Sequence, residues 1–354
     1  MEEKKHKRRV RYSGTHPRTY AEKYKEHNPE KYQDTIEKVI AKGSTPAGMH
    51  LSIMVEEILE FLEIKPGQIG LDATLGYGGH TTEMLKKLEG KGHVYGLDVD
   101  PIEIKKTEKR LADRGFGPEL FTPINTNFQN IDKVAEEYGP FDFILADLGV
   151  SSMQIDNPER GFTYKYDGPL DLRLNPEEGI SAAKRLKNVS VDELEGMLIE
   201  NSDEPYAYEI AKELVSRNKG GKKIETTLDL KNAIEAALRK SKEYSKLSKK
   251  DQEETAKKSC ARVFQALRID VNNEFEVLYD LLEKLPGALK PGGRVAVLTF
   301  HSGEDRLVKK SFKSFKREGI YSEVARDVVR PSAKECHRNP RAKSTKMRWA
   351  VKNL

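Results

Sequence analysis

Apolar residues recur with helical spacing where the folded part of the chain is expected to begin. From Ile53 to Leu62 apolar positions return every three or four residues, as in a helix with one buried face. The dipeptide Pro66-Gly67 then interrupts this pattern ahead of the short apolar run IGLDATL. The pattern therefore predicts a helix that leads into a buried strand.

The chain continues with alternating helical and strand-like segments. HTTEMLKKLEG and PIEIKKTEKRLADR have helical periodicity. The runs HVYGLDVD, LFTPINTNF and FDFILADLG have the length and composition of strands, and ALKPGGRVAVLTFH at residues 288–301 adds another. Short buried strands that alternate with helices form a parallel sheet covered on both faces. We therefore expect an α/β fold with a mostly parallel sheet.

A long segment without strand patterns interrupts this alternation. Residues 156–284 begin with loop sequences and continue as highly charged helical patterns. We predict an inserted, mainly helical domain there, and a sheet domain formed by residues 46–155 and 285–354. Residues 1–45 are polar and basic with little apolar periodicity, which favours an arm. The closing run MRWAVKNL alternates apolar and polar residues and predicts a last strand at the edge of the sheet.

Composition narrows the class of protein. No run approaches the roughly 18 apolar residues that a membrane span needs, and the N-terminus lacks the apolar stretch of a signal peptide. We therefore expect a cytoplasmic protein that does not enter a membrane. The cysteines, Cys260 and Cys336, lie far apart and outside any metal-binding spacing. We expect neither a disulfide framework nor a bound metal.

The net charge of +5 is unevenly distributed. The first 25 residues carry nine Lys or Arg against three acidic residues, and residues 326–348 carry eight against two. Both segments are candidates for contacts with the phosphates of a nucleic acid. An ordinary solvated surface stays open as the alternative.

A glycine-rich turn follows the first predicted strand, which ends in Asp72. Gly76, Gly78 and Gly79 allow the backbone to approach a ligand closely, although a tight strand-to-helix turn would also select them. Asp98 ends the second strand about 20 residues further on, where a carboxylate can accept the hydroxyls of a ribose. Together these residues predict a ligand that contains adenosine.

Two classes of enzyme use such a ligand, dehydrogenases and methyltransferases. The turn is not G-x-G-x-x-G, and the chain has no G-x-x-x-x-G-K-[ST] sequence, so binding of a pyrophosphate is disfavoured. The fourth strand ends in ADLGVSS, which brings Asp147 to the same edge of the sheet. That position suits the substrate that accepts the methyl group.

Five blocks, in order, resemble one family, the RsmH (MraW) methyltransferases: ADLGVSSMQID, RGFTYKYDGPLDLR, FQALRIDVNNE, TFHSGEDR and NPRAKSTKMR. The resemblance covers residues 49–351. It implies a Rossmann-like class I methyltransferase domain with an inserted helical domain. It also implies methylation of the N4 amine of a decoding-centre cytosine in 16S ribosomal RNA of the small subunit, with S-adenosyl-L-methionine as cofactor.

The resemblance implies roles for individual residues. The cofactor contacts would come from Gly76, Gly78, Gly79, His80, Asp98, Phe128, Asp147 and Gln154. Asp147 is the candidate catalytic residue, assisted by Ser151 or Ser152, because it can hold the amine and take its proton. Phe128 as a core residue, and His80, Ser151 and Ser152 as helix caps, stay open as alternatives.

Candidate substrate residues follow the fourth and fifth strands. They are Arg160, Phe162, Tyr164, Arg173, His301 and Asp305. Phe162, Tyr164 and Tyr166 are candidates for stacking on a base that has left its stack, and simple packing is the alternative for about half of this group. The block TFHSGEDR departs from the family's S-F-H-S-L-E-D-R, with Thr299 and Gly303 substituted.

Other functions stay open beside this one. A cofactor-binding RNA or ribosome assembly factor would keep the fold without catalysis, and a paralogous RNA amino-methyltransferase would act on another nucleotide. A DNA amino-methyltransferase is disfavoured, because DLGV stands where such enzymes carry [DNS]-P-P-[YF]. The oligomeric state is open, and a homodimer is one possibility.

Overall fold

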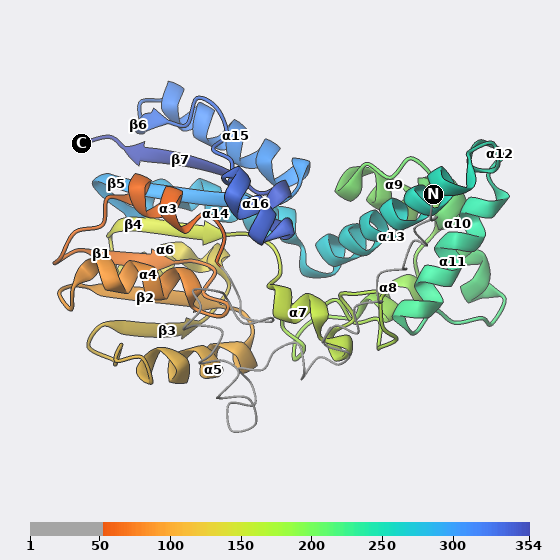
Figure 1. Cartoon of the computed structure of the whole chain (residues 1–354), viewed down its shortest axis with the longest axis horizontal. Coiled ribbons are helices and arrows are strands. Elements are labelled where there is room, and N and C mark those ends of the chain that lie inside the picture. Colours follow the sequence, from red (N-terminus) through yellow and green to blue (C-terminus); the bar gives the residue numbers. More distant parts are fainter. Residues whose placement is uncertain (1–51) are drawn as a thin grey trace, which may run out of the picture. The chain divides into compact units, whose positions relative to one another are not determined.

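The computed structural model describes residues 52–354, so the basic arm expected at residues 1–45 lies outside the described residues. Seven strands form one sheet in the order β3-β2-β1-β4-β5-β7-β6 (Figure 1). Their bounds are β1 Ile69–Asp72, β2 His93–Asp98, β3 Phe121–Asn125, β4 Phe141–Asp147, β5 Leu289–Thr299, β6 Tyr321–Val324 and β7 Lys346–Lys352.

The first five strands of the sheet are parallel, as the alternation predicts, and β7 is antiparallel to both of its neighbours. The expectation that the final strand lies at the sheet edge is wrong. β7 lies between β5 and β6, and β6 forms the edge. The alternation in MRWAVKNL predicts a strand, but it does not predict the position of that strand. The position depends on the chain returning from β6 to insert β7 between β6 and β5.

Helices cover both faces of the sheet. One face carries α3 Val55–Leu62, α4 Gly79–Leu88 and α5 Pro101–Ala112, whose buried side chains share a core with Phe143 and Leu145 of β4. The other face carries α6 Ile131–Tyr138, α14 Glu274–Ala288 and α15 Ser302–Arg317, packed against Ile144 and Val295. Because strand side chains alternate between faces, β4 contributes to both cores.

The segment between β4 and α14 has a hydrophobic core of its own. Its helices are α7 Ser152–Asp156, α8 Ala182–Lys187, α9 Val191–Ser202, α10 Ala207–Lys219, α11 Thr227–Lys240, α12 Lys242–Ser245 and α13 Lys249–Asn272. The buried residues of this core run from Phe162 to Leu267. Helix α14 instead buries Leu278, Leu281 and Leu285 in the core of the sheet. The remaining elements are α16 Ala333–Arg338 and the short 3-10 helices η2 Phe128–Asn130, η3 Pro158–Arg160 and η4 Pro340–Ser344.

Within residues 52–354, no helix is long and apolar enough to cross a membrane.

Candidate functional site

Three carboxylates end neighbouring parallel strands: Asp72 ends β1, Asp98 ends β2 and Asp147 ends β4. The order of the strands reverses between β1 and β4, and ligands of open α/β sheets bind outside the carboxyl ends of the strands at such a reversal. The sheet therefore gathers the predicted cofactor and catalytic residues at one edge.

The glycine turn has the backbone conformation that the sequence analysis anticipates. Gly76 and Gly78 have φ angles of 47° and 74°, in the left-handed region that favours glycine. Gly78 caps α4 and Gly79 is its first residue, so His80 lies inside the helix and is not its N-cap. A Cβ atom on Gly79 would come within 2.0 Å of the Ser52 hydroxyl, so a larger residue there would force that hydroxyl to turn away.

Neighbouring elements hold this turn in place. The carboxylate of Asp98 accepts hydrogen bonds from the backbone N–H groups of Gly76, at 2.9 Å, and Asp100, at 2.8 Å. From α5, the Thr107 hydroxyl donates to the Gly76 carbonyl. Arg110 also reaches the turn from α5, donating to the Tyr77 carbonyl at 2.8 Å with its guanidinium 3.4 Å from the Tyr77 ring centroid. Asp98, at the end of β2, thus helps to hold the glycine turn that follows β1.

Asp72 and Asp147 differ in what their carboxylates contact. Asp72 is buried, and its oxygens accept from the Thr81 hydroxyl at 2.6 Å and from the Thr74 N–H at 3.1 Å. Asp147 has Oδ2 at 3.5 Å from Nδ1 of His80, while its buried Oδ1 has no hydrogen-bond donor among the described residues. Asp147 therefore keeps one acceptor oxygen for a ligand, whereas Asp72 serves the local structure.

The tautomer of His80 follows from its other contact. Nε2 lies 2.9 Å from the carbonyl oxygen of Ile53, which can only accept a hydrogen bond, so Nε2 carries a hydrogen. A neutral His80 then directs the lone pair of Nδ1 at Asp147. One proton between Nδ1 and Oδ2 would satisfy both atoms.

Burial controls the titration of these carboxylates. Desolvation raises the pKa of Asp147 to about 6; the charge of His80 opposes this rise, and Asp72 and Glu304 add to it. Desolvation likewise raises the pKa of Asp98 to about 6, against the hydrogen bonds from Asp100 and Gly76. Both groups are mainly ionised near neutral pH and gain a proton in mild acid.

The edge of the sheet fits a cationic amino acid joined to a nucleoside. The free oxygen of Asp147 can accept from an ammonium group, and the glycines of the turn place no side chain between their backbone and a ligand. Asp98 stands at the second strand end, where a ribose would lie. Phe128 is partly buried and packs against the core of the sheet, in line with the core alternative.

Ser151 and Gln154 contact each other at the start of α7. The Ser151 N–H donates to Oε1 of Gln154 at 3.0 Å, and the Gln154 N–H donates to the Ser151 hydroxyl at 3.2 Å. This reciprocal pair is a capping box, so the cap alternative for Ser151 is confirmed. The side chain of Ser152 is not among those that the structure describes.

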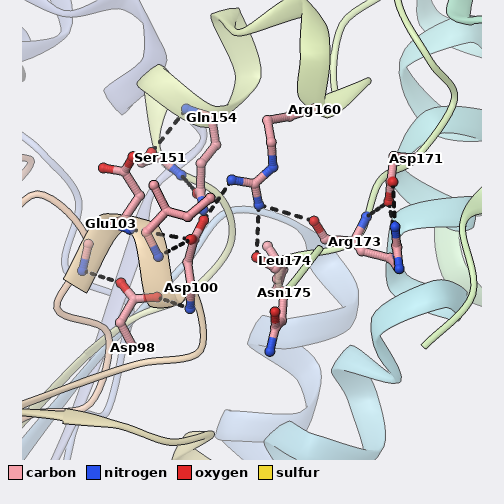
Figure 2. A network of polar contacts seen from close by, with 12 residues as sticks. Asp98, Asp100, Glu103, Ser151, Gln154, Arg160, Asp171, Arg173, Leu174 and Asn175 are labelled. Carbon is pink, nitrogen blue, oxygen red and sulfur yellow. Dashed lines mark hydrogen bonds and ion pairs between the residues drawn. The ribbon is translucent and has the colours of Figure 1, made fainter. Parts of the chain in front are cut away.

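Arg160 joins the loop after β4 to the cofactor edge (Figure 2). Its guanidinium donates to Oδ2 of the fully buried Asp100 at 2.6 Å, and to the carbonyls of Leu174 at 2.8 Å and Arg173 at 3.2 Å. Asp100 also accepts from backbone N–H groups at the start of α5. Arg160 is thus engaged within the protein and connects the loop before α8 to Asp100, the N-cap of α5.

Other candidate substrate residues also have partners inside the protein. Phe162 belongs to the core of the inserted helices, and the ring of Tyr164 packs 5.4 Å from that of Phe264. Arg173 forms a two-point ion pair with Asp171, at 2.7 and 2.8 Å, which lowers the pKa of Asp171. These contacts agree with the packing alternative for part of the group.

His301 and Asp305 lie at the start of α15, directly after β5. The His301 ring pairs with Glu304 at 3.1 Å and packs 5.8 Å from the Phe275 ring. Asp305 accepts from Arg348 at 2.6 Å and pairs with Lys346 at 3.2 Å, and these contacts lower its pKa. Asp305 therefore ties α15 to β7.

The residues that support the glycine turn are not evident from the sequence alone. Asp100, Thr107 and Arg110 belong to α5 or cap it. The run DVDP contained a signal for one of them, since an Asp directly before a proline is typical of a helix N-cap. No local pattern pointed to Thr107 or Arg110, because their partners lie on a different loop.

The arrangement of the sheet separates two classes of nucleotide-binding protein. An antiparallel β7 next to β5 is foreign to the all-parallel dinucleotide-binding sheet, and the turn lacks the pyrophosphate pattern. What remains is the class I, Rossmann-like methyltransferase fold. A model of the MraW methylase family matches residues 47–353, and the chain belongs to that family. The resemblance seen in the five motif blocks is confirmed.

Curated relatives agree with this assignment. The chain is 69% identical to ribosomal RNA small subunit methyltransferase H 1 of Lachnoclostridium phytofermentans, over 98% of this chain and 93% of the relative. It is 65% identical to the protein of the same name from Agathobacter rectalis, over 99% of each chain. Ribosomal RNA small subunit methyltransferase H of Carboxydothermus hydrogenoformans is 37% identical, over 86% of this chain and 97% of the relative.

Proposed function

We propose that this chain methylates the N4 amine of a decoding-centre cytosine in 16S ribosomal RNA of the small subunit. Membership of the MraW methylase family makes the chain a methyltransferase, and its methyl donor is S-adenosyl-L-methionine. The names of the relatives support small-subunit ribosomal RNA as the substrate. The cytosine and its N4 atom are the more specific part of the proposal. This substrate would place the enzyme in the cytoplasm.

The observation that carries the proposal is the free Oδ1 atom of Asp147, buried beside the glycine turn. S-adenosyl-L-methionine, when bound, supplies an activated methyl group. We assign its binding to Gly76, Gly78, Gly79, His80, Asp98, Phe128, Asp147 and Gln154. Some polar atoms in this group already have hydrogen-bond partners within the protein, as the carboxylate oxygens of Asp98 do. Oδ1 of Asp147 has none among the described residues.

An exocyclic amine of cytosine is a poor nucleophile because its lone pair is delocalised into the ring. A carboxylate that accepts its hydrogen bond favours the reactive geometry and can receive the proton after transfer. Asp147 is suited to this task because its pKa of about 6 leaves it ionised near neutral pH yet able to take a proton. His80 would then share that proton through Nδ1.

We further propose that the inserted helices recognise RNA. Lys165 and Tyr166 are exposed, which makes them better candidates for RNA contacts than the packed Phe162 and Tyr164. Since α14 packs on the sheet, we place the end of the inserted domain near Asn273 and not at residue 284. Small subunits are the natural substrate, and the enzyme could act as a monomer or a homodimer.

Methyl transfer to isolated small subunits tests the proposal. Subunits from a strain without the gene are incubated with labelled S-adenosyl-L-methionine and the purified protein. We expect label in 16S ribosomal RNA, and we expect Asp147→Ala to abolish it while the variant stays folded. The chain is an assembly factor instead if two results are found together. Neither wild-type protein nor Asp147→Ala transfers label to the subunits, and Asp147→Ala still restores the function that the strain lost with the gene.

A further inference from the structure

The outer face of α15 carries a continuous row of basic side chains. The exposed charged residues of this helix are Arg306, Lys309, Lys310, Lys313, Lys316 and Arg317. Successive members are one or three positions apart, which keeps them on one side of a helix with 3.6 residues per turn. The two acids of the helix do not offset this charge outward, because Glu304 is buried and Asp305 pairs with Arg348. We call these six residues the α15 basic row.

Several basic residues on other surface helices form ion pairs within their own helix. Lys86 on α4, Lys106 on α5 and Arg239 on α11 each pair with a carboxylate three or four residues away. Among residues 52–354, no member of the α15 basic row forms an ion pair. Lys316 donates to the carbonyl of Ser322, and Arg317 to that of Lys313, and neither contact neutralises a charge. Like charges at this spacing destabilise a helix modestly, so an anion bound along the row would stabilise it.

The position of α15 relates the row to the active edge. Leu298, near the end of β5, pairs with Asp147, and α15 begins three residues after β5 ends. Val308 and Phe312 then pack the inner side of the helix onto the sheet. In Figure 1, α15 extends alongside β6 and β7. The row thus begins about one turn beyond the catalytic edge and runs back across the molecule for about 16 Å.

We propose that the α15 basic row binds the phosphate backbone of the ribosomal RNA strand that leads to the target nucleotide. A length of about 16 Å accommodates several successive phosphates of one strand. Lysines that approach phosphates as point charges bind without regard to base sequence, so the row sets affinity and register, not the choice of base. This inference rests on the proposed function, which supplies the RNA.

The acidic side chains near the row indicate which lysines are free to bind RNA. Glu276 and Asp280 of α14 line a hollow together with Arg306 and Lys310, so the α14 side of the row faces carboxylates. A polyanion would be repelled there. Lys309, Lys313 and Lys316 are not part of this hollow. We therefore assign the phosphate contacts mainly to these three lysines.

A charge-matched pair of triple variants tests the inference. One variant carries Lys309→Gln, Lys313→Gln and Lys316→Gln. The control carries three substitutions of exposed lysines on helices of the opposite face of the sheet: Lys87→Gln, Lys105→Gln and Lys109→Gln. Both variants lower the net charge from +5 to +2, since each removes three of the positive charges. Any difference between them is therefore local to α15.

The salt dependence of binding to small subunits is the decisive measurement. For the α15 variant we expect weaker binding and a plot of log affinity against log salt that is shallower by about 2, since each lost phosphate contact removes roughly 0.7 to 0.9. The control and a triple Lys→Arg variant of the same α15 positions should keep the wild-type slope. Equal slopes for the α15 variant and the control would overturn the inference.

Turnover separates this inference from the proposed function. At low salt and saturating small subunits, the α15 variant should methylate at the wild-type kcat. When the concentration of small subunits is varied, only its KM should be raised. If wild-type protein methylates and the α15 variant matches the control in KM, the inference alone fails. If wild-type protein transfers no methyl group, the proposed function fails. A change in oligomeric state of the α15 variant, with RNA affinity unchanged, would assign the row to a second copy of the chain and overturn the inference.

Discussion

At the scale of single residues, the buried carboxylate of Asp147 lowers the stability of the folded protein near neutral pH, where its proposed function needs it. Its side chain is 21% exposed, its Oδ1 atom has no donor among the described residues, and burial raises its pKa to about 6. In an unfolded chain an aspartate titrates near pH 4. The folded protein therefore holds this proton more tightly, and the resulting stabilisation is present below about pH 4 and lost as the pH rises through 6.

Replacing Asp147 with asparagine should consequently stabilise the protein at neutral pH. Asparagine carries no buried charge, so we expect the free energy of unfolding to rise by about 2 kcal/mol at pH 7.5. The gain should shrink at pH 4, where the wild-type carboxyl is protonated. Urea unfolding at the two pH values measures both effects. A variant that is less stable at pH 7.5, or a gain that does not depend on pH, would contradict this account of the site.

Arg160 makes contacts that differ from those that its motif predicted. The motif suggested an RNA contact, whereas its guanidinium reaches the buried Asp100 and two carbonyls. We expect Arg160→Met to lower the free energy of unfolding by about 3 kcal/mol, because it leaves the carboxylate of Asp100 buried and unpaired. The double variant with Asp100→Asn should lose less than the two single variants together, as measured by a double-mutant cycle. Strictly additive losses would show that the pair does not interact.

At the scale of elements, local patterns predicted most helices and strands but not their neighbours. The strand that ends in Asp147 could be recognised because apolar runs and helical periodicity are properties of adjacent residues. The place of β7 inside the sheet could not, because it depends on pairing with β5 and β6 across long stretches of chain. The same reason hid Arg110, which supports the glycine turn from α5.

Gly303 illustrates how two elements adjust to each other. The resembled motif carries leucine at this position, and a Cβ atom here would lie 2.6 Å from Cζ of Phe275 on α14. We expect Gly303→Leu to cost about 2 kcal/mol of stability through overpacking. Combining it with Phe275→Ala should recover part of that loss, because the ring that blocks the space is removed. Thermal unfolding of the three variants checks this, and a double variant less stable than Gly303→Leu would refute the pairing.

At the scale of the whole molecule, the hydrophobic core of the inserted helices is separate from the two cores that cover the faces of the sheet. The buried residues from Phe162 to Leu267 pack among themselves, and separate clusters cover the two faces of the sheet. The sequence indicated this division through the loss of strand patterns after Ser151. It could not place the second boundary, because a helix that packs on a sheet and one that packs on other helices have similar periodicity.

The chain contains one natural probe in the sheet domain and another in the inserted helices. Trp349, the single tryptophan, stacks on Phe61 beside the sheet, with ring centroids 4.6 Å apart. Cys260 is buried in the core of the insertion, and burial raises its pKa to about 12, which keeps the thiol unreactive. In a Cys336→Ser background, we expect thiol labelling and tryptophan fluorescence to report different urea midpoints. Coincident midpoints would show that the sheet domain and the inserted helices unfold as one unit.

We propose that Asp147 and the glycine turn serve methyl transfer to one cytosine of small-subunit RNA. Mass spectrometry of 16S ribosomal RNA fragments tests it most directly, comparing a strain without the gene, complemented by wild-type protein or by Asp147→Asn. We expect one N4-methylated cytosine in the decoding-centre fragment with wild-type protein and none with Asp147→Asn. An unmodified fragment with wild-type protein, or full methylation with Asp147→Asn, would contradict it.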